Sequence, residues 1–256
     1  GFTLPMINRL MKGRAKARMP RTLILEPTRE LAAQVAENFD LYGQNTRLTK
    51  ALLIGGVSFG DQERAIERGA DVLIATPGRL LDHFERGKVL LSDVKILVID
   101  EADRMLDMGF IPAMRRIHAE LPKKRQTLMF SATFSREIEA LAGEFLHQPQ
   151  KIQVTPANTT VSRIDQTVYP VDKTRKTDLL KHLVTSERWG QVLVFSRTKH
   201  GADKISRKLS KAGISSDSIH GDKTQGSRTR SLKQFKDGGL QVLVATDIAA
   251  RGIDIQ

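Results

Sequence analysis

The sequence predicts an α/β protein with two domains, each a parallel sheet covered by helices on both faces. Short runs rich in Val, Ile and Leu recur along the chain, and helical stretches separate them. Apolar runs without alternation are typical of strands buried on both faces, and their alternation with helices favours a parallel sheet. The length of 256 residues is in the range where single cores begin to divide, which favours two domains.

The first half of the chain supplies one sheet. Its predicted strands are Thr22 to Leu25, Lys50 to Ile54, Val72 to Ala75, Ile96 to Ile99 and Thr127 to Phe130. Helical patterns such as Arg29 to Leu41 lie between them. We therefore expect a first domain over residues 1–153.

A second series of runs predicts a second sheet. It begins at Val168 and continues through Val192 to Phe195, Ser216 to Ile219 and Val242 to Ala245. Between the two series, residues 154–163 (VTPANTTVSR) are polar, contain a proline and have neither a helical nor a strand period. We expect a linker over 154–163 and a second domain over 164–256.

The composition excludes several classes of protein. Without cysteine there is no disulfide scaffold, thiolate zinc site or cysteine nucleophile, which fits a reducing compartment. No apolar run approaches the roughly 20 residues that cross a bilayer, and the N-terminus lacks the layout of a signal peptide. The six histidines have no spacing suited to a metal site. We expect a soluble cytoplasmic protein with no membrane partner.

The charge predicts a polyanionic partner. The net charge is +12, of which residues 1–150 carry +3 and residues 151–256 carry +9. A solvated basic surface is the alternative. Trp and Tyr total three, so few rings are available for stacking on bases. We expect contact mainly through phosphates, with weak sequence preference.

An acidic motif follows one of the predicted strands. After Ile96 to Ile99 come Asp100, Glu101, Ala102 and Asp103, at the end of the strand where open α/β sheets bind ligands. One carboxylate, Asp100, can hold a hydrated Mg²⁺ through water, while Glu101 polarises an attacking water. The alternative is a solvated helix N-terminus, where acidic side chains are favoured.

This motif and the others that accompany it resemble those of the DEAD-box RNA helicases, in order and spacing along essentially the whole chain. The matching segments are Pro27 to Leu31, Gly55-Gly56, Thr76 to Arg79, Asp100 to Asp103, Ser131 to Thr133, Val194 to Thr198, His220 to Asp222 with Gln225 and Arg228, and Ala245 to Asp254. The resemblance implies two RecA-like domains, ATP and Mg²⁺ as cofactors, and RNA as partner. The spellings GFTLP, DEADRMLDMGF and HGDKTQGSR are most similar to the bacterial RhlE-type subgroup.

The resemblance also assigns roles to residues. It implies catalytic roles for Asp100, Glu101, Asp103, Ser131 and Thr133, the last two linking the nucleotide site to unwinding. Asp100, Glu101, Gly252 and Asp254 are the implied nucleotide-binding residues. The implied RNA-binding residues are Thr28, Arg29, Gly55, Gly56, Thr76, Arg79, Arg197, Gly221 and Thr246. Asp247 and Arg251 are implied to hold the cleft between the domains.

A structural alternative accompanies each of these roles. Prolines can start helices that threonines and serines cap, arginines can be solvated, and glycines can form plain turns. Thr28, Thr76, Ser131 and Thr133 are candidates for such caps, and Arg29 and Arg79 for solvated arginines.

Two parts of the family pattern are absent from these 256 residues. No G-x-x-x-x-G-K-[ST] loop occurs, and the sequence ends before motif VI with its arginine finger. We therefore expect both domains to be incomplete. The resemblance implies that the intact protein is an RNA-stimulated ATPase that locally unwinds RNA duplexes as RNA and ATP close its domains. This chain alone is expected to bind RNA weakly without ATP turnover. The alternatives are a non-catalytic RNA-binding fragment and a DNA translocase of the same superfamily.

Overall fold

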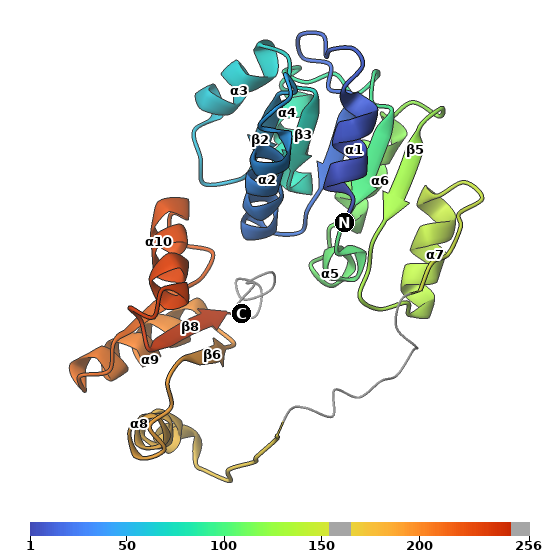
Figure 1. Cartoon of the computed structure of the whole chain (residues 1–256). Coiled ribbons are helices and arrows are strands. Elements are labelled where there is room, and N and C mark those ends of the chain that lie inside the picture. The colour runs from blue at the N-terminus through green and yellow to red at the C-terminus, as the bar shows by residue number, and fades with distance from the viewer. Residues whose placement is uncertain (154–164, 247–256) are drawn as a thin grey trace. The chain divides into compact units, whose positions relative to one another are not determined.

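The computed structural model describes residues 1–153 and 165–246, which form two compact units (Figure 1). The first unit contains Gly1–His147, and the second contains Gln148–Lys223 and the strand β8 (Val242–Thr246). The expected linker, residues 154–163, lies outside the described residues. The domain boundary after residue 153 stays a prediction.

The first unit is built on a five-stranded parallel sheet in the order β2-β3-β1-β4-β5. The strands are β1 (Thr22–Leu25), β2 (Lys50–Leu53), β3 (Val72–Ala75), β4 (Ile96–Ile99) and β5 (Gln126–Met129). Every residue of β1, β3 and β4 is buried. These three strands have the predicted bounds, and the prediction of burial on both faces is confirmed for them.

The two outer strands depart from that prediction. Burial alternates along β2, and β5 begins one residue earlier than expected, with Gln126 exposed and the rest half-buried. An edge strand has a neighbour on one side only and less helical cover. The expectation that all five strands are buried on both faces is therefore wrong at the sheet's edges.

Helices cover both faces of this sheet, as predicted. They are α1 (Thr3–Leu10), α2 (Arg29–Gly43), α3 (Phe59–Glu67), α4 (Pro77–Glu85), α5 (Ala102–Asp107), α6 (Ile111–Ala119) and α7 (Arg136–Phe145). Successive strand residues point to opposite faces. In β1, Ile24 belongs to the apolar layer beneath α1 and α2, whereas Leu23 and Leu25 belong to the layer beneath α3 to α7. The sheet thus separates two apolar cores.

The second unit contains a three-stranded parallel sheet in the order β6-β8-β7. Its elements are the 3-10 helix η1 (Lys173–Arg175), α8 (Lys176–Ser186), β6 (Val192–Ser196), α9 (Lys199–Lys211), β7 (Ser216–Ile219), α10 (Gln225–Lys236) and β8 (Val242–Thr246). The central strand β8 is fully buried, and its Val242 and Val244 pack with Val184 of α8 and Leu209 of α9.

One predicted element of this unit is absent. Val168 belongs to no strand, and 90% of its surface is exposed. Pro170, two residues later, has no N–H to donate to a ladder, which disfavours a strand in a sheet interior. The start of the second series at Val168 is therefore wrong.

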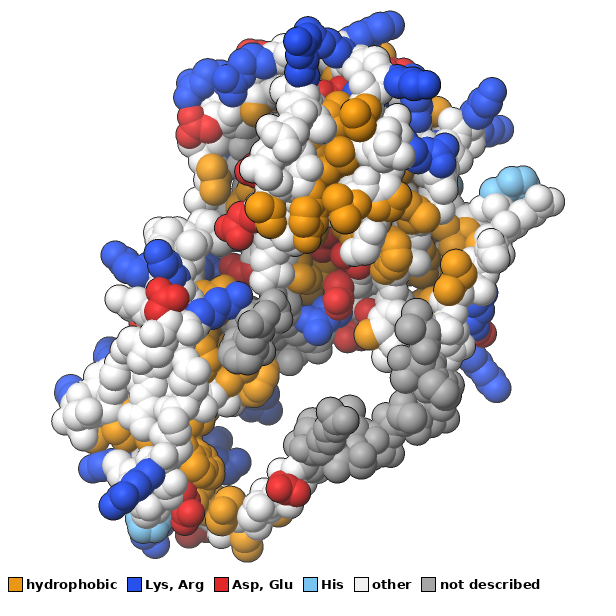
Figure 2. All heavy atoms as spheres, viewed as in Figure 1, with side chains coloured by type: hydrophobic (Ala, Val, Ile, Leu, Met, Phe, Trp, Pro, Cys, Tyr) orange, Lys and Arg blue, Asp and Glu red, His pale blue; other side chains and the backbone are white. Residues whose placement is uncertain are grey.

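The surface of both units carries many Lys and Arg side chains, as Figure 2 shows. No helix in the described part of the chain is long and apolar enough to cross a membrane.

Because each sheet is parallel, its strands all end at one edge. The predicted functional residues of the described ranges follow these strand ends.

Candidate nucleotide and RNA site

The acidic motif lies where β4 meets α5 in the first unit, and Figure 2 shows acidic side chains gathered there. The backbone N–H of Asp100 donates to Leu25 of the neighbouring strand at 3.1 Å, which fixes the chain at the end of the sheet. Oδ1 of Asp100 accepts from the N–H of Glu101 at 3.0 Å. Burial raises the pKa of Asp100, and this hydrogen bond opposes the rise.

Glu101 has an unusual backbone conformation. It precedes α5 with φ 52° and ψ 50°, the left-handed region that costs a residue with a side chain about 1–2 kcal/mol. Its carboxylate lies 2.6 Å from Nε of Arg104, one turn along the helix. Burial raises the pKa of Glu101, Arg104 lowers it, and Asp100 and Asp103 raise it further. The side chain makes no capping hydrogen bond, but Glu101 directly precedes α5 and Asp103 lies in its first turn, so the alternative of an acidic helix N-terminus also fits this position.

Asp103 and Thr133 connect the acidic motif to the segment after β5. Oδ2 of Asp103 accepts from the backbone N–H of Thr133 at 3.0 Å and from its hydroxyl at 2.9 Å. The hydroxyl of Ser131 donates to the carbonyl of Thr133 at 2.7 Å. The residue that caps α7 is Ser135, whose hydroxyl accepts from the N–H of Ile138. The alternative of Ser131 and Thr133 as ordinary helix caps is therefore wrong.

Sequence reasoning missed Glu26, which directly follows β1. Its side chain is fully buried, and neither carboxylate oxygen has a hydrogen-bond partner among the described residues. Burial raises the pKa of Glu26 well above its usual range, and the charges of Asp100 and Glu101 raise it further. The available signal was an acidic residue immediately after a strand predicted to be buried, next to the strand that carries the acidic motif.

These carboxylates fit a hydrated cation better than a directly bound one. Within the described residues, no group of three or more His, Asp or Glu side chains is arranged to hold a metal ion. Mg²⁺ keeps several waters and takes few protein ligands. Asp100 and Glu26 are buried carboxyl groups whose pKa is raised. A divalent cation close to them would offset the repulsion between their negative charges.

The two threonines predicted to contact RNA behave differently. Thr28 precedes α2, and its hydroxyl accepts from the N–H of Leu31 at 3.3 Å, so it does cap the helix. Thr76 occupies the same place before α4 but makes no side-chain capping bond, and Pro77 begins that helix. The capping alternative thus applies to Thr28 and not to Thr76.

The glycine pair makes room for an arginine. A Cβ built on Gly55 would lie 2.9 Å from one terminal nitrogen of Arg29, and a Cβ on Gly56 would lie 2.7 Å from the other. Gly56 also has φ +77°, which disfavours any other residue. The pair is therefore more than a plain turn, because it allows the Arg29 guanidinium to lie against the backbone.

Arg79 is also held, so the alternative of a solvated arginine is wrong for it. Its Nε donates to Oε1 of Gln62 at 3.1 Å, and its guanidinium carbon lies 3.4 Å from the centre of the Phe59 ring. Burial lowers the pKa of Arg79; Asp82 opposes this shift, and Arg86 and Arg29 add to it. Arg29 and Arg79 are thus near enough to repel each other.

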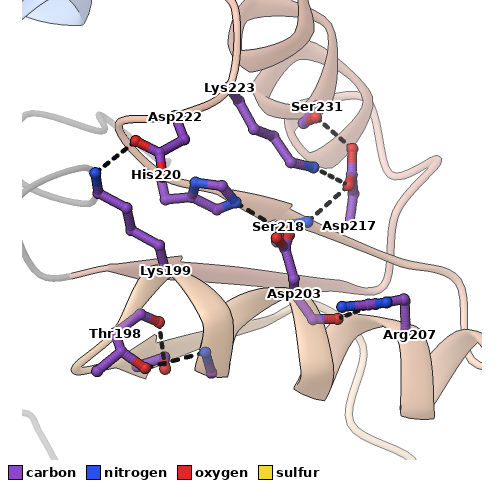
Figure 3. A network of polar contacts seen from close by, with 12 residues as sticks. Thr198, Lys199, Asp203, Arg207, Asp217, Ser218, His220, Asp222, Lys223 and Ser231 are labelled. Carbon is purple, nitrogen blue, oxygen red and sulfur yellow. Dashed lines mark hydrogen bonds and ion pairs between the residues drawn. The ribbon is translucent and has the colours of Figure 1, made fainter.

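In the second unit, the predicted residues meet at the end of the smaller sheet. Thr246 pairs with Ser196, directly before Arg197, and Gly221 follows the end of β7 by two residues. Thr198 caps α9 by accepting from the N–H of Gly201 at 3.0 Å (Figure 3). A Cβ at Gly221 would come no nearer than 3.7 Å to Lys199, so packing within the chain does not require glycine there.

A polar network supports this edge (Figure 3). Oδ1 of Asp203 accepts from the hydroxyl of Ser218 at 2.5 Å and lies 3.0 Å from Nε2 of the buried His220. Lys199 and Asp222 form an ion pair of 2.5 Å on the surface. The network holds the His220 side chain, and Gly221 is the next residue along the chain.

A second carboxylate in the network is equally well paired. Asp217 accepts from Lys223 Nζ and the Ser218 N–H, each at 2.7 Å, and from the Ser231 hydroxyl.

The last group of predictions lies outside the described residues: Asp247, Arg251, Gly252 and Asp254.

Comparison with known proteins agrees with the motifs. The DEAD/DEAH box helicase family matches residues 1–141, and the helicase conserved C-terminal domain matches residues 175–256. The ATP-dependent RNA helicase RhlB of Pseudomonas putida is 44% identical over 239 residues, or 92% of this chain and 60% of that protein. The ATP-dependent RNA helicase vasa of Drosophila melanogaster is 40% identical over the whole chain and 39% of its own length.

Solved structures give the same relationship. A structure of S. cerevisiae Dbp5 bound to RNA and ADP BeF3 matches with a TM-score of 0.84 and 30% identity, over 100% of this chain and 65% of that one. A DEAD box protein from Methanococcus jannaschii matches with a TM-score of 0.55 and 33% identity, over 100% and 69%. This chain thus spans about 60% or less of the curated relatives named here. With its α/β units and parallel sheets, the chain belongs to the DEAD/DEAH box helicase family.

Proposed function

We propose that the chain is the central part of an ATP-dependent RNA helicase, in which the acidic edge of the first unit positions the attacking water and both units hold the RNA backbone. The observation that carries the proposal is the cluster of Asp100, Glu101 and Asp103, with Thr133 bonded to the last of them. Carboxylates at the end of a parallel strand suit phosphoryl transfer, because they orient water and a hydrated cation beside a phosphate chain.

Each acidic residue has a distinct proposed task. Asp100 would hold a hydrated Mg²⁺ through water, and that ion would neutralise phosphate charge. Glu101 accepts a hydrogen bond from the attacking water and orients it. Its raised pKa improves its ability to take a proton at neutral pH. Asp103 links this edge to Ser131 and Thr133, so a change at the nucleotide reaches the segment after β5.

RNA contact is proposed for the two strand-end groups described above. In the first unit the group contains Thr28, Arg29, Gly55, Gly56, Thr76 and Arg79. In the second unit it contains Arg197, Gly221 and Thr246. The repulsion between Arg29 and Arg79 supports an anion there, because a phosphate between two guanidinium groups would relieve it. Backbone contacts favour selection by shape and 2′-hydroxyl groups over reading of base edges.

The sequence motifs supply the remaining assignments. Gly252 and Asp254 are proposed at the nucleotide, and Asp247 and Arg251 between the domains. Membership of the RhlE-type subgroup stays a prediction, as does a cytoplasmic location; the bacterial relative described above is a RhlB protein.

We also propose that the 256-residue chain by itself binds RNA weakly without turning over ATP, since no G-x-x-x-x-G-K-[ST] loop is among its residues. The test is RNA-stimulated phosphate release by this chain and by a longer version that carries that loop and motif VI. We expect turnover from the longer version only. Appreciable turnover by the 256-residue chain would contradict its proposed inactivity.

The same assay distinguishes an RNA helicase from the remaining candidate, a DNA translocase of the same superfamily. RNA and DNA duplexes of identical sequence are compared as stimulants of the longer version. We expect RNA to stimulate more strongly, because 2′-hydroxyl contacts favour it. Stronger stimulation by DNA would reverse the choice of substrate.

A further inference from the structure

The first unit contains a side-chain cluster whose members the proposed function leaves without a role, apart from Arg79. Phe59 and Gln62 lie on the first turn of α3, and Arg79 and His83 lie one turn apart on α4. Gln62 and His83 are buried, with 4% and 0% of their surfaces exposed. Polar side chains are rarely buried unless each has a hydrogen-bond partner. Gln62 and His83 therefore need hydrogen-bond partners inside the fold.

The orientation of the Gln62 amide follows from its contacts. Its nitrogen lies 2.8 Å from the carbonyl oxygen of Ile54, an acceptor that requires a donor. The amide oxygen must then face the other way, where it lies 3.1 Å from Nε of Arg79 and 2.9 Å from Nε2 of His83. Because an amide oxygen only accepts, both neighbours donate. His83 accordingly carries its proton on Nε2 when it is neutral.

Burial keeps His83 in that neutral form. Burial lowers the pKa of His83, and the cations Arg79 and Arg86 lower it further, while Glu63 and Asp82 oppose the shift. The ring also lies 5.0 Å from the Phe59 ring, measured between centres. At neutral pH, His83 is thus a fixed donor to Gln62, and the Gln62 oxygen is fixed toward Arg79.

Aromatic and backbone contacts complete the restraint on Arg79. The guanidinium carbon of Arg79 lies 3.4 Å from the centre of the Phe59 ring, and that of Arg86 lies 3.9 Å from the same centre. A terminal nitrogen of Arg79 donates to the carbonyl of Val57. These contacts hold the guanidinium at an orientation set by α3, α4 and the end of β2.

We infer that Gln62 is a positioning residue which, with Phe59 and His83, holds the Arg79 guanidinium ready for an RNA phosphate. The inference rests on the proposed RNA contact of Arg79. An arginine loses much rotamer freedom when it binds a ligand, and a guanidinium that is already ordered loses less. Gln62 accepts from Nε and the Val57 carbonyl accepts from one terminal nitrogen, which leaves the other terminal nitrogen to donate to a phosphate.

The first test is a mutant cycle on RNA binding by the 256-residue chain, followed by the anisotropy of a short fluorescein-labelled oligouridine. Arg79→Ala removes one phosphate contact, which corresponds to about fourfold weaker binding at about 0.15 M salt. The slope of the logarithm of the binding constant against the logarithm of salt concentration should become smaller by about 0.7. Gln62→Met keeps the volume and removes both polar atoms. We expect it to weaken binding by about twofold to fourfold, and the double variant to bind no more weakly than Arg79→Ala alone.

The second test reads the position of Arg79 directly. In ¹H–¹⁵N spectra without RNA, assigned with Arg79→Lys, we expect a resolved Arg79 Nε–H signal that Gln62→Met shifts or broadens through faster solvent exchange. Ile7→Val, a core truncation in the apolar layer on the other face of the sheet, serves as the control for lost stability. We expect it to leave both the signal and the RNA affinity unchanged.

The outcomes separate the inference from the function on which it rests. Two results would overturn the inference alone. In the first, the double variant loses affinity by the product of the two single losses. In the second, Gln62→Met binds RNA as tightly as the wild type and leaves the Nε–H signal unchanged. If Arg79→Ala binds oligouridine as tightly as the wild type, the proposed RNA contact of Arg79 fails. In that case a shifted signal in Gln62→Met would still show that Gln62 holds Arg79, in a structural role only.

Discussion

The ends of the two sheets place their acidic residues in opposite electrostatic settings. In the first unit, burial raises the pKa of Glu26 and Asp100, and Glu26 lacks a hydrogen-bond partner among the described residues. In the second unit, burial also acts on Asp203 and Asp217, but hydrogen bonds outweigh it and lower the pKa of both. At the first edge the charged form of these acids is therefore disfavoured, whereas the acids of the second edge are compensated by hydrogen bonds.

The ends of two parallel sheets can therefore suit two different ligands. An edge with uncompensated carboxylates suits a divalent cation and a polarised water. An edge whose carboxylates are occupied by Lys223, Ser218 and His220 leaves backbone amides and other cations for phosphates. Substitutions at the two edges should therefore have different consequences.

The largest effect is expected at the acidic motif of the first edge. In the longer version with restored turnover, Glu101→Gln removes the group that takes a proton from water and should lower RNA-stimulated phosphate release by about 10²–10⁴-fold. Glu187→Gln, the same change at an exposed residue that follows α8 in the second unit, is the matched control and should change turnover little. Intact turnover in Glu101→Gln would refute the role assigned to that residue.

Glu26→Gln should stabilise the free protein at neutral and higher pH, by about 1–3 kcal/mol, because the fold disfavours the charged form of Glu26 and glutamine has no charged form. The sign follows from linkage. The pKa of Glu26 is higher in the folded protein than its value of 4.5 in the unfolded chain. The contribution of Glu26 to the free energy of unfolding is therefore fully present below pH 4.5, and it is lost as pH rises through the pKa of the folded state.

Urea unfolding of the 256-residue chain across pH, without magnesium, measures this difference. The two proteins should converge near or below pH 4.5 and diverge above it. A constant difference at every pH would mean that Glu26 does not titrate as its surroundings require.

The second edge should respond in the opposite direction. Asp217→Asn weakens the contact with Lys223 and should cost about 1–2 kcal/mol at neutral pH. Because the pKa of Asp217 is lowered, its contribution is present above the unfolded value of 3.8 and is lost as pH falls through the folded pKa. Equal stability of wild type and variant at neutral pH would remove the contrast between the edges.

The smallest effects concern the helix caps, which the two edges share. Thr28→Ala and Thr198→Ala each remove a capping hydrogen bond and should each cost about 1 kcal/mol of unfolding free energy. Thr76→Ala removes no such bond and should stay within about 0.5 kcal/mol. Thermal unfolding checks all three, and an equal loss at Thr76 would mean that it caps α4 in solution.

The sequence predicted the central strands well because their burial leaves a continuous apolar run, as in β1, β3 and β4. It did less well where tertiary contacts decide. Val168 has the composition of a strand, but Pro170 and the lack of a pairing partner leave it exposed. Ser135 caps α7 instead of the motif residues before it, which only the chain path after β5 determines.

Side-chain partners were the part that the motifs could not supply. The motif spelling placed Arg79 and Gly55-Gly56 at the RNA, but it gave no sign that Gln62 bonds to Arg79 or that the glycines accommodate Arg29. These contacts join residues far apart in the sequence, and such pairings depend on the packing of α3, α4 and the strand ends.

The left-handed backbone at Glu101 sets stability against activity at a single position. A glycine there would relieve the conformational strain and would make the fold easier to form. The hydrogen bonds that Asp100 and Thr133 make around it would not require a side chain at position 101. Apart from the ion pair with Arg104, folding by itself therefore favours glycine at this position over the glutamate that the chain carries.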